Sequence, residues 1–217
     1  MNAQRLRRIE WLMWSGLLVV VAGIVLAFLL AHLKLRMLLG KPLPVYGQVA
    51  DFTLTNQNGR VVTLADLRGK VWVADIIFTR CPGPCLKMTR QMKELALPPS
   101  SQARLVTLTT DPDYDTPQIL KAYAERGGAD TSRWMFLTGS KTEIAKLAID
   151  SLKLTAIEKK PGERESPNDL FVHSTIFVIV DKRAQLRGVF ETMGEGVEPR
   201  QVKTQILAAI RRLERER

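Results

Sequence analysis

The chain contains the stretch Val71-Trp72-Val73-Ala74-Asp75-Ile76-Ile77-Phe78-Thr79-Arg80-Cys81-Pro82-Gly83-Pro84-Cys85. Residues 71–78 form a nearly continuous apolar run, which is typical of a central parallel strand covered on both faces. A helix-forming segment, residues 86–95, follows directly. The only two cysteines of the 217-residue chain therefore lie where a central strand turns into a helix, the position that open α/β sheets favour for ligand and reaction sites.

Strands and helices alternate along most of the remaining chain. The turn Asn56-Gln57-Asn58-Gly59 has the Asn-Gly chemistry of a hairpin, and Thr116-Pro117 predicts the start of a helix. Residues 155–169 form a polar stretch that we expect to be a loop. We expect strands at residues 52–54, 61–63, 71–78, 104–109, 134–137, 174–180 and 186–190, and helices after 85, after 116, at 141–152 and at 199–215. This order predicts a mixed sheet with helices on both faces, a three-layer α/β domain.

An apolar segment near the N-terminus predicts a membrane anchor. Residues 11–33 contain no charged side chain, and these 23 residues reach about 34 Å as a helix, enough to cross a hydrocarbon core of about 30 Å. The segment is longer than the apolar region of a signal peptide, and residues 31–34 do not form a cleavage site of small residues. We expect a cytoplasmic stub (1–10), a single transmembrane anchor (11–33), a linker (34–49) and a folded domain (50–217).

The residues on either side of the anchor indicate its orientation and the membrane in which it lies. Basic residues before and after the span nearly balance, so the positive-inside rule favours a cytoplasmic N-terminus only slightly. No Arg/Ser-rich, acid-poor presequence precedes the span. We expect a protein of the bacterial inner membrane with its C-terminal domain in the periplasm, and the alternative is the mitochondrial inner membrane.

The net charge of the chain is +10, and eight of these charges lie beyond residue 33. Such an excess favours anionic surfaces, of which nucleic acid is one. The sequence has no basic stripe interleaved with aromatic residues, and the membrane anchor argues against a nucleic-acid partner. We therefore expect none.

The cysteine pair leaves three possibilities open: a disulfide, a redox-active dithiol, or two thiolate ligands of a soft metal ion. A helix N-terminus and the neighbouring Arg80 favour thiolate, and Pro-Gly-Pro between the cysteines exposes the pair instead of burying a structural disulfide. His173 is the only histidine outside the anchor and lies just before the strand at 174–180. Its position alone cannot bring it to the cysteines.

Several stretches within residues 50–217 resemble the SCO/SenC family of membrane-anchored, thioredoxin-like copper proteins that assist cytochrome c oxidase assembly. The matching residues are Asp51-Phe52-Thr53-Leu54 with Gly59, Leu64-Ala65-Asp66-Leu67-Arg68-Gly69-Lys70, Phe78-Thr79-Arg80-Cys81-Pro82 with Cys85, Asp111-Pro112-Asp113-Tyr114-Asp115-Thr116-Pro117, and His173-Ser174 ahead of a strand that ends in Asp181. A CxxxC motif alone is a weak signal, whereas this ordered set is specific.

The resemblance implies a thioredoxin-like fold in which Cys81, Cys85 and His173 bind one copper ion, Cu(I) or Cu(II). It implies a copper chaperone that delivers copper or reducing equivalents to the copper centre of a terminal oxidase. The expected partners are the copper-containing subunit of that oxidase or another copper chaperone. This chain departs from the family at two positions, because many members carry acidic residues where it has Gly83 and Val172.

Asp75 supports a competing hypothesis. It is the one charged residue of the apolar strand and lies six residues before Cys81, like the buried acid of thioredoxins that helps to take a proton from the second cysteine. In that case the protein is a thiol–disulfide oxidoreductase of cuproprotein cysteines, with Cys81 attacking and Cys85 resolving. Alternatively, Asp75 pairs with a lysine or lies at a polar sheet edge. A third hypothesis is a non-metal interaction subunit of a respiratory complex, so the sequence leaves open whether the protein is an enzyme.

Overall fold

A computed structural model describes residues 3–39, 42–81, 83–164 and 170–216. The chain divides into two units, Met1–Pro42 and Leu43–Arg217, which are described separately.

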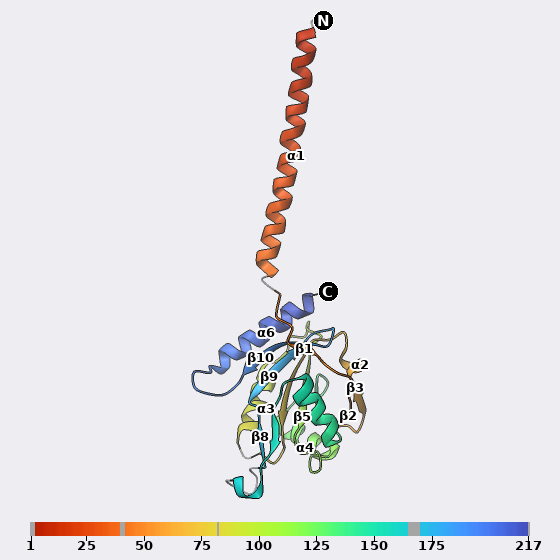
Figure 1. Ribbon diagram of the computed structural model, residues 1–217, viewed down its shortest axis with the longest axis vertical. Helices are drawn as coiled ribbons and strands as arrows, with labels where there is room; N and C mark the ends of the chain where they lie inside the picture. Colours follow the sequence, from red (N-terminus) through yellow and green to blue (C-terminus); the bar gives the residue numbers. More distant parts are fainter. Residues whose placement is uncertain (1–2, 40–41, 82, 165–169, 217) are drawn as a thin grey trace. The chain divides into compact units, whose positions relative to one another are not determined.

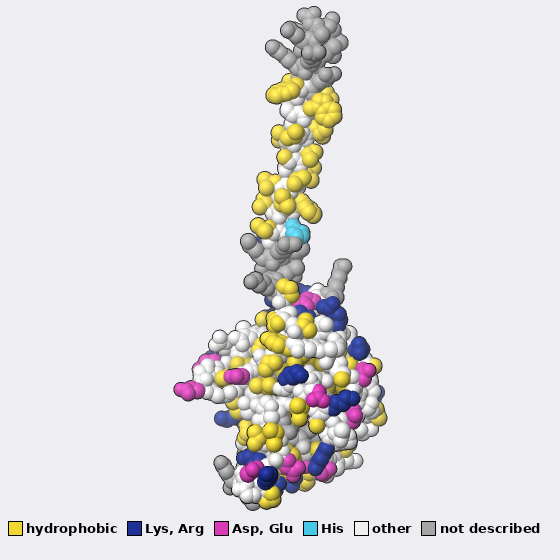
Figure 2. All heavy atoms as spheres, in the orientation of Figure 1, with side chains coloured by type: hydrophobic (Ala, Val, Ile, Leu, Met, Phe, Trp, Pro, Cys, Tyr) yellow, Lys and Arg dark blue, Asp and Glu magenta, His cyan; other side chains and the backbone are white. Residues whose placement is uncertain are grey.

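The first unit is the helix α1 (Ala3–Leu39). Its segment Trp11–Lys34 has a mean hydropathy of 2.7, and none of its side chains is buried. These 24 residues extend about 36 Å, so the segment is long and apolar enough to cross a membrane. Figure 2 shows hydrophobic side chains along the described part of this helix. The helix runs on through Leu39, into the stretch 34–49 that was expected to be a linker.

The second unit is built on an eight-stranded mixed sheet with the order β1-β10-β9-β4-β5-β6-β2-β3. Figure 1 shows the strands and helices of this unit. β4, β5 and β6 are parallel, and the other neighbouring pairs are antiparallel. The strands are β1 (Gly47–Gln48), β2 (Thr53–Asn56), β3 (Val61–Thr63), β4 (Trp72–Ile77), β5 (Arg104–Thr109), β6 (Trp134–Thr138), β9 (Ile176–Val180) and β10 (Gln185–Glu191). A separate antiparallel hairpin pairs β7 (Ala156–Glu158) with β8 (Phe171–His173).

Helices cover both faces of the sheet because successive side chains of the buried strands point to opposite sides. In β4, Val73 and Ile77 pack in one core with α3 (Pro84–Glu94), α4 (Pro117–Gly127) and α6 (Pro199–Arg215). Trp72, Ala74 and Ile76 pack in the other core with α2 (Leu64–Leu67), α5 (Lys141–Ala145) and the π-helical turn Lys146–Ser151. The three-layer α/β architecture expected from the sequence is therefore confirmed.

The hairpin β7–β8 is the main difference from the sequence-based expectation. Residues 155–169 were expected to form a loop, but the structure places β7 and the 3-10 turn Pro161–Glu163 there, while residues 165–169 lie outside the described part. The strand expected at 174–180 begins only at Ile176, and His173 instead ends β8. Each strand of the hairpin has three residues, too few for a clear alternation in the sequence.

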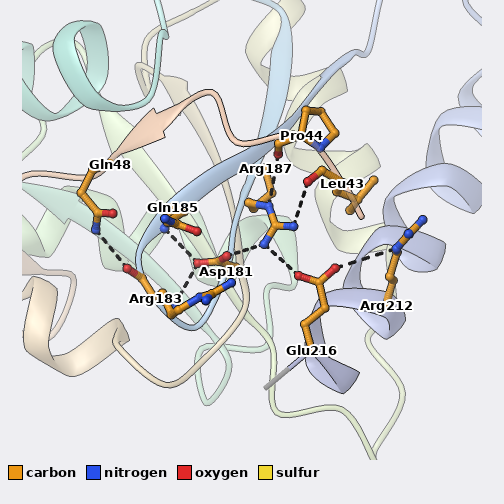
Figure 3. Close-up of polar contacts among 9 residues, drawn as sticks. All are labelled: Leu43, Pro44, Gln48, Asp181, Arg183, Gln185, Arg187, Arg212 and Glu216. Atoms are coloured by element: carbon orange, nitrogen blue, oxygen red, sulfur yellow. Dashed lines mark hydrogen bonds and ion pairs between the residues drawn. The ribbon is translucent and has the colours of Figure 1, made fainter. Parts of the chain in front are cut away.

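A buried arginine joins the start of the second unit to its C-terminal helix (Figure 3). The Arg187 side chain is 3% exposed and forms ion pairs with Asp181 at 2.6 Å and Glu216 at 2.9 Å. It also donates hydrogen bonds to the backbone carbonyls of Leu43 and Pro44. One guanidinium group therefore fixes the chain where it enters the domain.

Candidate metal centre

The two cysteines lie where the chain passes from β4 into α3, as the sequence predicts. Cys81 is in the turn that follows β4, where its amide donates to the carbonyl of Phe78 at 3.2 Å. Cys85 is the second residue of α3, after Pro84 at the first helical position, and Gly83 is the N-cap. Both cysteines are free, so they form no disulfide in this structure. The expectation that Pro-Gly-Pro exposes the pair was wrong, because both side chains are buried in the core that α3 forms with the sheet.

The hairpin β7–β8 brings His173 to the cysteine pair. The Nε2 atom of His173 lies 3.1 Å from the Sγ atom of Cys85. The three possible ligand atoms of Cys81, Cys85 and His173 all lie within 4.8 Å of one another. The structure thus assembles the three residues that the family resemblance implies, from segments separated by 88 positions in the sequence.

The imidazole of His173 is oriented by its neighbours. Its Nδ1–H donates to the carbonyl oxygen of Ser174 at 3.2 Å, because a carbonyl can only accept. Nε2 is the ring nitrogen that faces the sulfur of Cys85, so it is the nitrogen placed to bind a metal ion beside the cysteines. The ring of Phe78 meets the imidazole edge-on with centroids 5.9 Å apart, and it meets Phe171 of the same strand as His173 at 5.2 Å.

The two thiols are electrostatically unequal. A hydrogen bond from the Cys85 thiol is the main cause that lowers the pKa of Cys81 to about 4, against the cost of burial, with help from His173 and the amides of Gly83 and Cys85. Burial, and then the thiolate of Cys81, raise the pKa of Cys85 above its ordinary value. Cys81 is therefore the thiolate at neutral pH, and Cys85 holds its proton until a metal ion or a reaction partner displaces it.

Asp75 lies beneath this site on the central strand β4 and is fully buried. Its Oδ1 accepts a hydrogen bond of 2.6 Å from the Thr107 hydroxyl, which itself accepts one from the indole of Trp134 at 2.9 Å. Its Oδ2 has no partner within the described residues. Burial raises its pKa to about 7, although the Thr107 hydrogen bond and the charge of His173 lower it. Neither alternative expected for Asp75, a lysine partner or a polar sheet edge, is found in the described part of the chain.

Asp115 positions the turn before Cys81, a role that was not expected from the sequence. Its carboxylate accepts from the backbone amide of Thr79 at 3.1 Å, from the Thr79 hydroxyl, and from the Thr109 hydroxyl at 2.5 Å. Burial raises the pKa of Asp115. These bonds tie the turn before Cys81 to the end of β5, and the aspartates of residues 111–117 were the sequence signal for them.

Arg80 is held by two residues of the same segment. It donates to Asp111 at 2.5 Å, and its guanidinium lies over the ring of Tyr114 at 4.1 Å. This contrasts with the expectation that Arg80 acts on the cysteines, because its charge is paired with Asp111 and it is not among the main causes of the lowered pKa of Cys81. The helix start, expected for the same purpose, does contribute through its amides.

Comparison with known proteins identifies the family. The model of the SCO1/SenC family matches residues 44–211, which is most of the chain and nearly the whole second unit. The chain belongs to the SCO1/SenC family. Among its relatives, the SCO1 protein homolog of Bacillus subtilis is 38% identical over 142 residues, which are 63% of this chain and 70% of that protein. The SCO2-like protein of Rickettsia felis is 28% identical over 134 residues, 60% of this chain and 63% of that one. These matches span about two thirds of the curated relatives.

Solved structures of SCO1/SenC proteins share the fold. A SCO1/SenC family lipoprotein from Bacillus anthracis is 29% identical with a TM-score of 0.65, over 78% of this chain and 96% of that one. BsSco, described as a member of the Sco family of cytochrome c oxidase assembly proteins with a disulfide switch, is 28% identical with a TM-score of 0.66, over 82% of this chain and all of that one. ScoI of Bradyrhizobium japonicum, solved with copper bound, has a TM-score of 0.56 at 24% identity, over 77% of this chain and 99% of that one, and shows the fold alone. The thioredoxin-like fold expected from the sequence is confirmed.

Proposed function

We propose that this SCO1/SenC protein binds one copper ion through Cys81, Cys85 and His173 and delivers it to the copper centre of a terminal cytochrome oxidase during assembly. The observation that carries the proposal is the convergence of two sulfur atoms and one imidazole nitrogen within 4.8 Å. The expected recipient is the copper-containing oxidase subunit or another copper chaperone.

The donor set suits copper. Two soft thiolates favour Cu(I), and an imidazole as third ligand allows Cu(II) as well. The Nε2 atom of His173 faces the sulfur of Cys85 while Nδ1 bonds to the carbonyl of Ser174, so the imidazole is already oriented with Nε2 toward the metal site. Three protein ligands leave a coordination position for a ligand of the recipient, which is the arrangement that a transfer protein requires.

The family and the membrane anchor both support a role in oxidase assembly. BsSco, of the same fold and family, is described as a cytochrome c oxidase assembly protein, and ScoI of Bradyrhizobium japonicum shows that this fold can carry copper. The span Trp11–Lys34 can hold the protein at the membrane where a terminal oxidase is assembled. We place the second unit in the bacterial periplasm, and the alternative is that the protein belongs to the mitochondrial inner membrane.

Copper titration of the full chain in detergent tests the three-ligand site. We expect about one copper per chain and a sulfur-to-copper charge-transfer band in the Cu(II) form, because two thiolates bind the metal. His173→Ala should abolish the band, whereas His32→Ala, the same substitution at the histidine in the apolar segment of α1, should leave it unchanged. Copper binding that His173→Ala leaves intact would refute the three-ligand site.

A second candidate function, thiol–disulfide oxidoreductase, is favoured by the unequal thiols. Cys81 has the low pKa of an attacking thiolate, and Cys85 lies behind it as a resolving thiol. Asp75 has a pKa near neutrality and is close enough to raise the pKa of Cys85 through its charge, so it can take the proton of Cys85. Stoichiometric reduction of a disulfide substrate by the reduced, copper-free protein, with Cys81 and Cys85 oxidised to a disulfide and the activity lost in Cys81→Ser, would decide for this function. If oxidase assembly survived loss of both cysteines, the third hypothesis, an interaction subunit, would hold.

A further inference from the structure

A groove of about 500 Å³ opens between α3 and α4, and Cys81 is part of its lining. Leu86 lines it near the start of α3, and Arg90 and Lys93 follow along the same helix. Arg126 lines it from α4. The groove therefore leads from a proposed metal-ligand sulfur to a cluster of three basic side chains.

The helices aim these side chains into the groove by their spacing. Leu86, Arg90 and Lys93 are four and three residues apart, which places them on one face of α3. The floor is closed by a hydrogen bond of 2.8 Å between the buried hydroxyls of Thr89 and Tyr123. Because the hydroxyls of Thr89 and Tyr123 are hydrogen-bonded to each other, a ligand is recognised by the side chains at the sides of the groove and not by these two at its floor.

The basic walls lack acidic partners. Arg90 and Arg126 are exposed, and neither forms an ion pair or a side-chain hydrogen bond with any residue that the structure describes. Among the described residues, the Lys93 side chain donates only to the backbone carbonyl of Gly127, at 3.1 Å. No acidic residue is among the described residues that line the groove. Three like charges around one groove repel one another, and an acidic ligand relieves that repulsion.

The length of the groove indicates the kind of ligand. From Leu86 to Lys93 the helix α3 rises about 10 Å, which equals about three residues of an extended polypeptide. The end near Cys81 carries the exposed apolar side chain of Leu86, and the far end carries the positive charges. A single small anion would occupy the basic end alone, whereas an extended peptide fills both ends.

We propose that this groove is the docking site for an acidic, extended segment of the protein that exchanges metal or electrons with Cys81. The segment carries a soft side chain that reaches Cys81, and acidic residues three or four positions away that contact Arg90, Lys93 and Arg126. The proposal rests on the proposed function and adds to it the chemistry by which the partner is recognised.

Peptide binding to the full chain in detergent tests the proposal. The probe is a fluorescein-labelled, terminally blocked peptide, Met-Ala-Ala-Glu-Glu-Glu, and its neutral counterpart has Gln in place of each Glu. In low salt, fluorescence polarisation should show the acidic peptide bound at least about tenfold more tightly, because exposed charge contacts of this number contribute about that much. The double variant Arg90→Glu/Arg126→Glu should remove this preference. Lys121→Glu, on α4 but outside the groove, should change it by less than about twofold.

Two results would overturn the docking site. One is equal binding of both peptides, or an acidic preference that survives the double variant. The other is displacement of the peptide by inorganic phosphate at equal concentration, which would make the groove a site for single anions. Copper binding measured on the same samples separates this proposal from the proposed function, because Arg90 and Arg126 are not among the metal ligands. A protein that fails to bind copper but keeps the charge-dependent peptide preference would refute the copper site and retain the groove.

Discussion

Asp75→Asn should make the stability of the domain less dependent on pH. Burial raises the pKa of Asp75 from 3.8 to about 7. Below pH 3.8 the carboxyl group is neutral in the folded and the unfolded chain, so its burial does not lower the free energy of unfolding through ionisation. Between pH 3.8 and about 7 the Asp75 carboxyl ionises only in the unfolded chain. The free energy of unfolding therefore falls with each pH unit, until the total loss reaches about 4 kcal/mol.

The asparagine variant lacks this loss. Its amide nitrogen takes the place of the unpartnered Oδ2, which costs about 1–3 kcal/mol, but this cost is the same at every pH. The stability of the variant minus that of the wild type should therefore rise by about 3 kcal/mol from pH 5 to pH 8 and stay constant above that. Cys81, whose pKa is lowered, contributes the opposite pH dependence, but it does so in both proteins and cancels in the difference.

Urea unfolding of the copper-free, reduced fragment 42–217 at pH 5, 6, 7 and 8 measures this difference. Asp51→Asn is the matched control, because its carboxylate is 90% exposed and water solvates it in the folded and unfolded chain alike. A difference between wild type and Asp75→Asn that does not change with pH would refute the reasoning, since it would mean that Asp75 ionises as easily inside the fold as outside it.

Two further predictions concern groups that support the site and the domain boundary. Arg187→Met should lower the free energy of unfolding by about 3–5 kcal/mol in urea titrations, because it leaves the buried Asp181 carboxylate without its cation; a loss below about 1 kcal/mol would contradict a structural role for the ion pair. Phe78→Leu removes the ring that meets His173 and should weaken copper binding about tenfold in competition with a chelator; an unchanged affinity in a folded variant would show that Phe78 does not orient the imidazole.

The main sheet could be predicted from the sequence because its strands are long and buried. β4 is buried at all six positions, and an apolar run of that length with turn residues around it has few other interpretations. The hairpin β7–β8 could not be predicted in this way. The paired side chains of Ile157 and Val172 are 59% and 49% exposed. The two strands therefore lack the buried apolar pattern by which a strand of the main sheet can be predicted. Contacts of Phe171 and His173 with the end of β4 place the hairpin instead.

The residues of the site also differ in how far they could be predicted from the sequence. The cysteine pair is visible in the sequence because its two members are close together and are the only cysteines. His173 reaches them through a hairpin whose existence the sequence does not indicate, so only the family resemblance pointed to it. Asp115 escaped notice because its role depends on donors from Thr79 and Thr109, which belong to two different strand ends.

Gly83 stands where many family members have an acidic residue, and this difference concerns the electrostatics of the site more than its geometry. A side chain at Gly83 would meet nothing within 4 Å, so packing around this position leaves room for a larger residue. An acidic side chain at this N-cap would compete with Cys81 for the amides at the start of α3, which now help to lower the pKa of Cys81. Glycine leaves those amides to the sulfur. A family position that many members fill with an acid can therefore be glycine here without loss of the thiolate, and the negative charge of the site then belongs to Cys81 itself.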